Sequence, residues 1–479
     1  MNSSLESRVA GQLTRRAFFR RSGLGLGAMA LGSLLQRDAA ATGRGGGLIQ
    51  PLHHAARAKR VIYLFQSGAP SHLDLYDPKP KLKEMTGVDL PDSVRMGQRI
   101  TGMTSGQKNL FCVGSPFDFK AQGQCGTEIS GILPHIGRIA DRICLLRAVH
   151  TDPINHDPAV TYLFTGHQQP GRPTLGAWAS YGLGSENDSL PAFIVLLSGR
   201  GGQSLQTRYW GSGFLPSRHQ GVQFRGAGDP VLFFSNPPGV SADTRRAMLD
   251  DLNVLNRDQL AAVGDPEIET RIQAYEMAFR MQTSVPELMN IANESQETLE
   301  LYGAKPGEAS FANNCLLARR LVERGVRFVK LIHRDWDHHG GLPDGIRTQA
   351  GLTDRASAAL VLDLERRGLL DDTLVVWGGE FGRTSYCQGE LRRESFGRDH
   401  HPRCYSLWLA GGGIKPGMVH GETDELGYNI VKDGVHIHDL HATLLHCLGL
   451  DHERVTFRFQ GRDFRLTDVA GKVVKPILA

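Results

Sequence analysis

The chain has 479 residues, of which 40% are hydrophobic and 22% are charged. This length and balance indicate a globular protein with a large core, and they exclude a fibrous or disordered chain. Six arginines against Glu6 and Asp38 give residues 1–41 a net charge of +4, which equals the formal charge of the whole chain. The remainder is therefore close to neutral, so we expect no nucleic-acid partner.

The first predicted element, residues 1–41, is similar to a twin-arginine signal peptide. Thr14, Arg15, Arg16 and Phe18 match its Ser/Thr-Arg-Arg-x-Phe pattern, and a mildly apolar stretch and small residues follow in the required order. We therefore expect export through the twin-arginine translocase and a periplasmic or extracellular protein. No later segment reaches the roughly 18 apolar residues of a membrane span, so the mature protein is expected to have none.

Residues 42–59 are predicted to be a linker, and residues 60–479 are predicted to be the folded domain. Three short apolar runs, "RVIYLF", "RICLLRAV" and "PAFIVLL", are typical of buried strands. Residues 200–310 change to loop-like and then helical sequence, which indicates an inserted helical cap. In the last third, the predicted strands "RFVKLI", "TLVVWGG" and "YSLWLAGGG" alternate with segments of helical spacing.

This alternation predicts the fold class. Strands that alternate with helices form βαβ units, which give an α/β fold with a largely parallel sheet and helices on both faces. Ligands of such folds bind beyond the carboxyl ends of the strands. Five polar stretches follow predicted strands and are expected to meet at that edge: "QSGAPSHLD" (66–74), "HTDPINHDPA" (150–159), "HRDWDHHGG" (333–341), "GGEFGRT" (378–384) and "GRDHHPR" (397–403).

These stretches are rich in metal-binding side chains. A Zn²⁺-type ion takes imidazole nitrogen and carboxylate oxygen, and separate loops can supply one or two ligands each. Asp337 and His339 are separated by one residue, so in an extended loop they lie on one side while His338 faces away. The alternatives are structural: "DWDHH" as a solvated turn, "DHHP" as a capped turn with exposed histidines, and "GGEFGRT" as an ordinary strand end.

The stretch "NHDPAVTYLFTG" predicts a helix that starts near Pro158, with Asp157 as its cap and His156 at its entrance. A helix amino terminus beside a metal cluster is a natural anion site. The alternative is an ordinary capped helix. The histidines of "HIHDLHATLLHC" lie on and beside a later helix that Asp439 caps, and we expect them to be structural.

Three stretches resemble the sulfatase and alkaline phosphatase superfamily. "TLVVWGGEFG" is similar to its strand that ends in Ser-Asp-His-Gly, with Glu380 at the aspartate and Phe381 at the histidine. "DLHATLLHCLG" is similar to its late Asp-Leu-x-Pro-Thr-Leu-Leu helix. The run from "LPHIGRIA" to "YLFTG" is similar to its segment from "TPNLDRLA" to "CxPSRAxLLTG", and it places His156 where that superfamily carries a Cys, Ser or Thr nucleophile.

Residues 58–479 as a whole resemble the exported bacterial family known as domain of unknown function family 1501, which implies an alkaline phosphatase-like fold. The motifs that carry this resemblance are W-D-x-H at 336–339, G-G-E-F-G-R-T at 378–384 and D-H-H-P at 399–402. Two features depart from the hydrolase pattern of the superfamily. Gln66 and Ser67 stand where its first strand ends in a metal-binding Asp, and Phe381 replaces a ligating His. Of the two metal positions that the superfamily has, one therefore lacks much of its ligand shell in this sequence.

The resemblance implies one intact position for a divalent ion. Zn²⁺ is the first expectation, with Mn²⁺, Mg²⁺ and Ca²⁺ as alternatives. The implied metal ligands are Asp337, His339, and His400 or His401, with Glu380 completing the shell or acting as general base.

The function implied by these residues is an exported hydrolase of phosphate or sulfate esters. Arg383 is expected to clamp the anionic ester, and Ser67 and Asp157 are expected to contact it. His156 is a nucleophile, a proton shuttle or a third imidazole ligand, and the sequence leaves these roles open. The alternative is a non-catalytic exported binding or surface-associated protein that retains the fold, which the missing strand-end Asp and the missing hydroxyl or thiol nucleophile favour.

Overall fold

The computed structural model describes residues 47–201, 204–226, 230–231 and 235–479. The expected signal peptide and the first part of the expected linker lie outside these residues. From Gly47 the chain packs on the domain: the N–H groups of Leu48 and Ile49 donate to backbone carbonyls of residues 181 and 182. Among the described residues, no helix combines the length and the apolar character that crossing a membrane requires.

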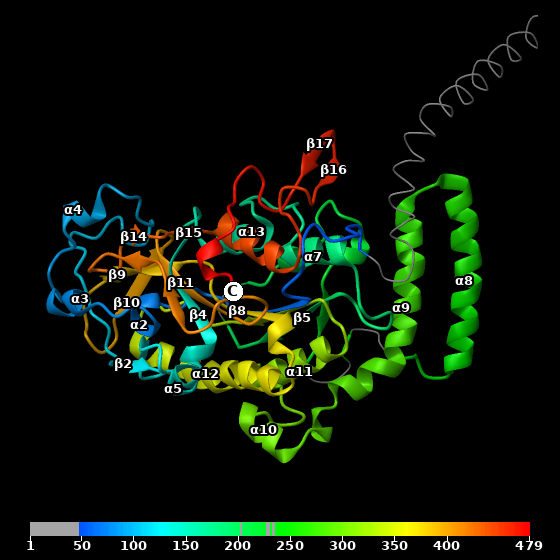
Figure 1. Ribbon diagram of the computed structural model, residues 1–479, viewed down its shortest axis with the longest axis horizontal. Coiled ribbons are helices and arrows are strands. Elements are labelled where there is room, and N and C mark those ends of the chain that lie inside the picture. The colour runs from blue at the N-terminus through cyan, green and yellow to red at the C-terminus, as the bar shows by residue number, and fades with distance from the viewer. Residues whose placement is uncertain (1–46, 202–203, 227–229, 232–234) are drawn as a thin grey trace, which may run out of the picture.

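A mostly parallel sheet forms the centre of the fold (Figure 1). Its strands, in spatial order, are β12 (Met418–His420), β4 (Ile143–His150), β11 (Tyr405–Ala410), β8 (Thr373–Gly378), β1 (Arg60–Gln66), β7 (Phe328–His333), β5 (Phe193–Ser198) and β6 (Val222–Phe224), with β15 (Val435–His436) also on β4. Only the two pairings that involve β11 are antiparallel. The largely parallel α/β fold expected from the sequence is confirmed.

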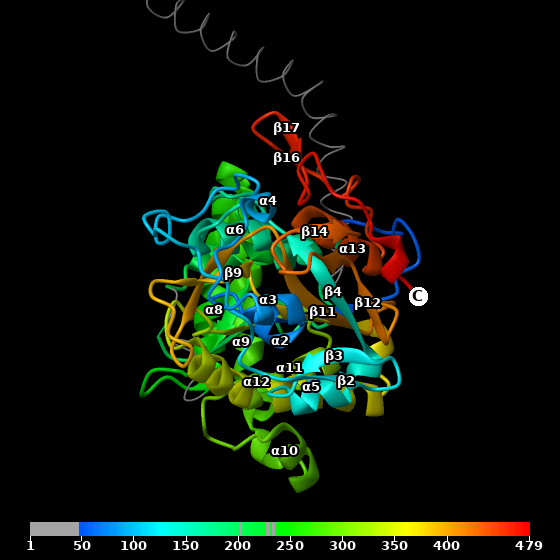
Figure 2. The ribbon, with the colours of Figure 1, turned by 90° about the vertical axis from the view of Figure 1, so that its left-hand side faces the viewer.

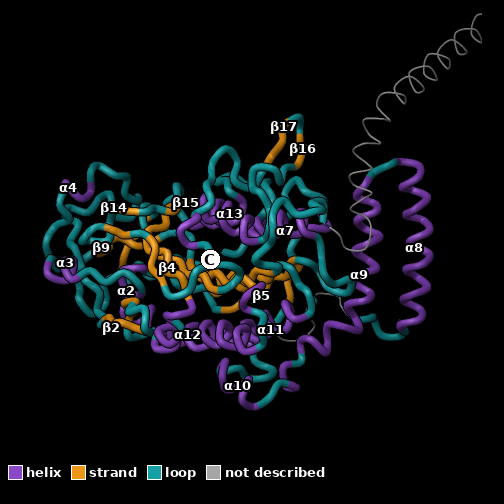
Figure 3. Tube along the Cα trace, viewed as in Figure 1, coloured by secondary structure: helices purple, strands orange, loops and turns teal. Residues whose placement is uncertain are grey.

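Helices cover both faces of this sheet because its strands are apolar on both sides. In β1, Ile62 and Leu64 enter one core cluster, while Val61, Tyr63 and Phe65 enter the other, as the two-residue period of a strand requires. The first cluster includes side chains of α5 (Pro134–Arg138), α11 (Phe311–Glu323) and α12 (Leu342–Arg366). The second includes α6 (His156–Thr165), α7 (Leu175–Leu183) and α13 (Ile437–Cys447). Figure 3 shows α11 and α12 on one side of the strands and α7 and α13 on the other.

Smaller elements complete the domain. The segment between β1 and β4 contains α2 (His72–Leu75), α3 (Pro80–Glu84), α4 (Asp92–Arg95), β2 (Phe119–Gln122), β3 (Thr127–Ser130) and η1 (Ala140–Arg142). The last third adds η5 (Leu370–Asp372), β9 (Gly382–Gln388), β10 (Gly397–His401), β13 (Glu422–Thr423), β14 (Ile430–Lys432), β16 (Phe457–Phe459), β17 (Arg462–Phe464) and η6 (Lys475–Ile477). β9 and β10 pair with each other outside the central sheet.

The region expected to be a helical cap divides into two parts. It comprises η2 (Thr207–Trp210), η3 (Ser217–His219), β6, α8 (Ala242–Val263), α9 (Pro266–Met289), η4 (Ile291–Asn293) and α10 (Gln296–Tyr302). The antiparallel pair α8 and α9 stands at the end of the molecule opposite β9 and β10 in Figure 1, and Figure 2 views the molecule from the β9 end. The short helix η2, by contrast, packs beside α6. The η2 part of this region therefore reaches the helix that begins at His156.

A buried ion pair joins the β9–β10 hairpin to α2. The guanidinium of Arg398 donates from Nε to Oδ2 of Asp74 at 2.8 Å, and both side chains are fully buried. Its other nitrogens donate to the carbonyls of Thr384 and Val113. Each partner of such a pair offsets the desolvation of the other, so removal of one leaves an uncompensated buried charge.

We expect Asp74→Asn to lower the free energy of unfolding by about 3–5 kcal/mol, because Arg398 then loses its counter-charge in a dry environment. Urea denaturation followed by circular dichroism measures this change. Glu390→Gln is the matched control, because the Arg392–Glu390 pair is exposed on both sides, and it should leave the urea midpoint unchanged. Equal midpoints for the two variants would contradict the assignment of a stabilising role to the buried pair.

Lys330 carries a buried amine in the middle of β7. Its Nζ donates to the carbonyl of Tyr209 at 2.5 Å and lies 3.2 Å from the centre of the Phe164 ring. Burial holds the pKa of Lys330 well below its usual value of 10.5. The folded protein therefore binds fewer protons than the unfolded chain between that lowered pKa and 10.5, and its stability rises with pH across this window.

Lys330→Met should remove this dependence. As the pH falls from about 9.5 to about 7, the free energy of unfolding of the wild type should decrease relative to that of the variant. The reason is that only the wild type has to lose a proton on folding. Urea titrations at several pH values test this. Parallel curves for the two proteins would show that the amine keeps its ordinary pKa.

Candidate metal centre

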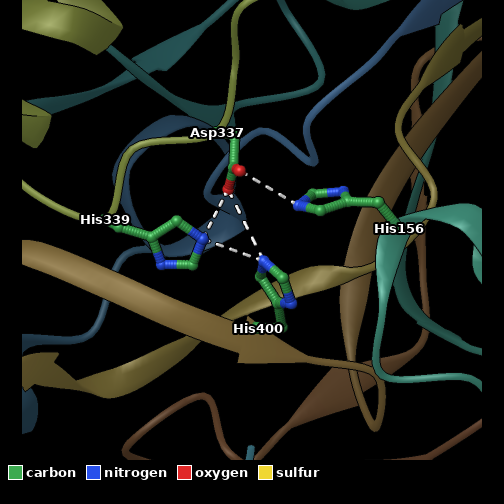
Figure 4. Close-up of side chains that lie close together, drawn as sticks. All are labelled: His156, Asp337, His339 and His400. Atoms are coloured by element: carbon green, nitrogen blue, oxygen red, sulfur yellow. Dashed lines mark hydrogen bonds and ion pairs between the residues drawn. The ribbon is translucent and has the colours of Figure 1, made fainter. Parts of the chain in front are cut away.

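Four metal-binding side chains from separate segments meet at the carboxyl edge of the sheet (Figure 4). His156 opens α6 after β4, Asp337 and His339 lie in the loop after β7, and His400 lies on β10. One ligand atom from each of them lies within 4.8 Å of the others. The parallel topology explains this meeting, because the ends of β4 and β7 lie on the same edge.

The carboxylate of Asp337 is the centre of the cluster. Its Oδ1 lies 2.8 Å from Nε2 of His339 and 3.5 Å from Nε2 of His400, and its Oδ2 lies 3.2 Å from Nε2 of His156. The Nε2 atoms of His339 and His400 are 3.0 Å apart. All three imidazoles therefore direct their Nε2 atoms at the carboxylate of Asp337.

The second nitrogen of each imidazole is held by an oxygen atom. Nδ1 of His156 lies 2.6 Å from Oε1 of Glu380, Nδ1 of His339 lies 2.5 Å from Oε1 of Gln388, and Nδ1 of His400 lies 2.9 Å from the backbone carbonyl of Ile154. Because an oxygen accepts in each case, the proton of a neutral imidazole sits on Nδ1. This is the support that metal-binding histidines usually have.

The resulting lone pairs fit a cation. With protons on both Nδ1 atoms, Nε2 of His339 and Nε2 of His400 present lone pairs to each other across 3.0 Å. Two facing lone pairs repel unless a positive charge lies between them or beside them. Three imidazole nitrogens and one carboxylate oxygen form a donor set that suits Zn²⁺ and other transition ions. The residues of this cluster are therefore able to hold a divalent metal ion.

The pKa values agree with a charged, crowded cluster. Burial raises the pKa of Asp337, but its contacts with His156, His339 and His400 and the charge of Arg383 outweigh burial and hold the pKa well below its ordinary range. Burial lowers the pKa of His400. Burial also lowers the pKa of His156, yet its two carboxylate neighbours outweigh this and the net shift is upward. The carboxylate of Asp337 is thus always available as an anionic ligand.

Arg383 is buried beside Asp337 and makes four hydrogen bonds there. Its Nε donates to the carbonyl of Ala69 at 2.9 Å, Nη1 donates to the carbonyl of Arg398 at 3.2 Å, and Nη2 donates to Oδ1 of Asp337 at 2.6 Å and to the carbonyl of Gly68. Its side chain is 1% exposed. The structure therefore places Arg383 as a tie between loops, without a free face for the anion that the sequence assigned to it.

Gln66 and Ser67 also have structural contacts. The Gln66 side chain donates to the carbonyl of Leu64 and accepts from the indole N–H of Trp336 at 2.9 Å. Ser67 is 1% exposed, and its backbone N–H donates to the carbonyl of His333 at 2.8 Å. Gln66 thus orients the loop that carries Asp337, and Ser67 lies buried below it. Contact of Ser67 with a substrate stays a prediction.

Strand geometry separates His400 from His401. Successive side chains of β10 point to opposite sides. His400 faces the cluster, whereas His401 donates from Nε2–H to the carbonyl of Tyr428, 2.7 Å away, and stacks on the Tyr428 ring with centroids 4.1 Å apart. Of the two histidines that the sequence left open, the structure brings only His400 to Asp337. His338, as expected, turns away and packs near Trp336.

Glu380 lies behind His156 and outside the four-residue cluster. Its Oε1 contacts Nδ1 of His156 and accepts from the backbone N–H of Gly68 at 3.1 Å. Its Oε2 is buried and has no hydrogen-bond partner among the described residues. Glu380 is therefore placed to orient His156, and a direct role as a metal ligand stays a prediction.

Several supporting residues carried no signal in the sequence. Gln388, the Ile154 carbonyl and Gly68 contact the site only because the chain returns to it from distant positions. A glycine is required at 68, where φ is +105° and an added Cβ would lie 2.6 Å from the backbone N of Asp337. The glycine and proline of "QSGAPS", which predicted a loop there, were the one hint of this close approach.

Comparison with known proteins places the chain in a family. A family model described as a protein of unknown function, DUF1501, matches residues 58–478. The chain belongs to the DUF1501 family. The family expected from the motifs is thus confirmed. No curated protein matches the sequence.

Solved structures similar to this DUF1501 protein include members of the alkaline phosphatase superfamily. The lipoteichoic acid synthase LtaP from Listeria monocytogenes is 9% identical, with a TM-score of 0.36 and coverage of 90% of this chain and 79% of that one. A protein in the alkaline phosphatase superfamily from Vibrio parahaemolyticus is 10% identical, with a TM-score of 0.34 and coverage of 85% and 70%. Alkaline phosphatase from the Antarctic bacterium TAB5 is 10% identical, with a TM-score of 0.32 and coverage of 82% and 99%.

Gly397 gives a test of how the loops support the site. An added Cβ there would lie 1.9 Å from the carbonyl carbon of His339, so Gly397→Ala must push the His339 loop away. We expect metal affinity to fall by about tenfold or more, since displaced supporting residues commonly cost this much. Isothermal titration with Zn²⁺ measures the effect. Gly351→Ala is the control, because an added Cβ there meets nothing within 4 Å. Similar zinc affinities for the two variants would contradict the loop arrangement.

Proposed function

We propose that this DUF1501 protein is an exported, metal-dependent hydrolase of phosphate or sulfate esters. The observation that supports this most is the meeting of three imidazole Nε2 atoms at one carboxylate, each imidazole being already fixed through its Nδ1. The twin-arginine pattern within residues 1–41 supports export to the periplasm or the extracellular space. The substrate is an anionic ester, because a metal cation favours developing negative charge.

Asp337, His339 and His400 are the proposed metal ligands. The two imidazoles converge on Oδ1 of Asp337, whereas His156 faces Oδ2. Three protein ligands leave one position of a tetrahedral site for a substrate oxygen, as catalytic zinc sites require. Imidazole-rich sets favour Zn²⁺ over Mg²⁺ and Ca²⁺, which prefer oxygen. When bound, the cation supplies Lewis acidity toward an ester oxygen.

His156 is the proposed general base. Its Nδ1–H donates to the buried carboxylate of Glu380, which fixes the ring and stabilises the imidazolium that forms when Nε2 takes a proton. The backbone N–H of Gly68 holds Glu380 in turn. Nε2 thereby faces Oδ2 of Asp337 at 3.2 Å, and in this position it can accept a proton from a water that attacks beside the carboxylate. The same nitrogen can return that proton to the leaving oxygen.

One observation supports a second function. All four ligand atoms lie within 4.8 Å of each other, so His156 is also able to complete a closed, four-ligand shell. Closed shells are typical of structural zinc sites. In that case the protein is a non-catalytic exported binding or surface-associated protein in which the ion holds the loops together.

Metal analysis separates these functions. We expect the purified mature protein to contain about one equivalent of a divalent ion. His339→Ala should lose both the ion and the hydrolysis of aryl phosphates or sulfates, because it removes a central ligand. Elemental analysis and an ester panel with added Zn²⁺, Mn²⁺, Mg²⁺ or Ca²⁺ measure both properties. Full activity in metal-free protein would rule out the mechanism.

Three further variants sharpen this experiment. His401→Gln and His167→Ala should retain the ion, because His401 faces away from the cluster and His167 lies beyond the end of α6. His156→Ala should retain the ion and lose hydrolysis if His156 is the base. Loss of the ion in His156→Ala, with no ester cleaved by the wild type, would instead support the structural site.

A further inference from the structure

The proposed hydrolase needs a cationic side chain that can reach the substrate. Arg383 cannot supply it, because its guanidinium is buried and already donates to three carbonyls and to Asp337. Asp157 makes the need greater, because its carboxylate follows His156 directly and its side chain is 61% exposed. An uncompensated carboxylate at this position would repel an anionic ester.

Arg208 compensates that carboxylate. It lies on η2, in the region inserted between the sheet strands β5 and β7, and its Nη2 donates to Oδ1 of Asp157. Its side chain is 31% exposed, and its Nε is buried without a partner among the described residues. Arg208 therefore has one nitrogen committed to Asp157 and further donors to spare.

The backbone that carries Arg208 is firmly anchored. The neighbouring residue Tyr209 is buried, its hydroxyl donates to Oδ1 of Asp157 at 2.6 Å, and its carbonyl accepts from Lys330 at 2.5 Å. Trp210 is also buried. Tyr209 thus holds η2 both to the first turn of α6 and to the central sheet, which keeps the guanidinium of Arg208 beside Asp157, the residue that follows His156.

Arg208 makes the charge beside the cluster more favourable to an anion. Three carboxylates, Asp157, Asp337 and Glu380, stand against the guanidinium groups of Arg208 and Arg383, with the imidazoles neutral. A divalent cation changes this sum from one negative to one positive charge. Without Arg208 the same site is neutral. The helix α6 adds the positive end of its dipole, and its N-cap residue makes no side-chain hydrogen bond to the first turn.

We propose that Arg208 binds the anionic group of the substrate directly, and that the buried neighbour Tyr209 fixes the backbone that carries it. The ligand class is a tetrahedral oxyanion, a phosphoryl or sulfuryl group, which a guanidinium recognises through two parallel hydrogen bonds. This inference rests on the proposed function, because the cation and Arg208 share one anion. Arg208 is then a specificity residue that the inserted region supplies to the site on the sheet.

Titration of the zinc-loaded protein with inorganic phosphate or sulfate tests this inference. Arg208→Ala should keep the zinc content of the wild type and weaken phosphate binding about tenfold or more, the expected cost of losing a charge-assisted hydrogen bond. Asp157→Asn should tighten phosphate binding, because it removes a negative charge and frees Arg208. Arg392→Ala, at an exposed ion pair elsewhere, is the control and should bind phosphate as the wild type does.

The double variant Arg208→Ala/Asp157→Asn distinguishes contact from net charge. It restores the sum of charges in the wild type, so phosphate binding stays weak only if the guanidinium itself touches the anion. Wild-type phosphate affinity in Arg208→Ala or in the double variant overturns the inference. A wild type that takes up zinc but no phosphate overturns it as well and leaves the metal site standing. A wild type that takes up no zinc overturns both proposals.

Discussion

The guanidinium of Arg383 is the contact on which the whole site depends. The loops after β1 and β7 and the β9–β10 hairpin come together without regular secondary structure between them, so their buried carbonyl groups need donors. Arg383 supplies donors to Gly68, Ala69 and Arg398 at once, and it pairs its own buried charge with Asp337. Arginine is suited to this position because its five N–H groups lie in one rigid plane.

A second constraint is the pairing of His156 with Glu380. In the resemblance to sulfatases, these residues stand at the positions of a nucleophile and of a metal-binding aspartate. Here they contact each other at 2.6 Å. Gln66, at the place of another metal ligand, holds the indole of Trp336. The residues that depart from the hydrolase pattern thus support the cluster around Asp337, and the geometry is consistent with one cation position.

Much of the fold followed from the sequence, and part of the site did. Apolar runs alternating with helical segments predicted the parallel sheet. Strands buried on both faces, such as β1 and β8, consist of continuous apolar runs that are recognisable in the sequence. The same reasoning brought Asp337, His339 and His156 to one edge. The choice between His400 and His401 depended on the register of β10 against β9, which no local pattern reveals. The contacts of Arg383 were also out of reach, because both Gly68 and Ala69 lie more than three hundred residues away in the chain.

The reversed direction of β11 has a consequence for how ligands enter the centre. In a fully parallel sheet, only residues that follow a strand arrive at the carboxyl edge. β11 runs the other way, so it starts at this edge, and the residues that precede it are delivered there instead. His400 is such a residue, since β10 leads into β11 within a few positions. Because β11 is inverted, His400 reaches the centre from the segment before a strand, whereas the other residues reach it from segments after a strand. The imidazoles therefore surround Asp337 from two sides.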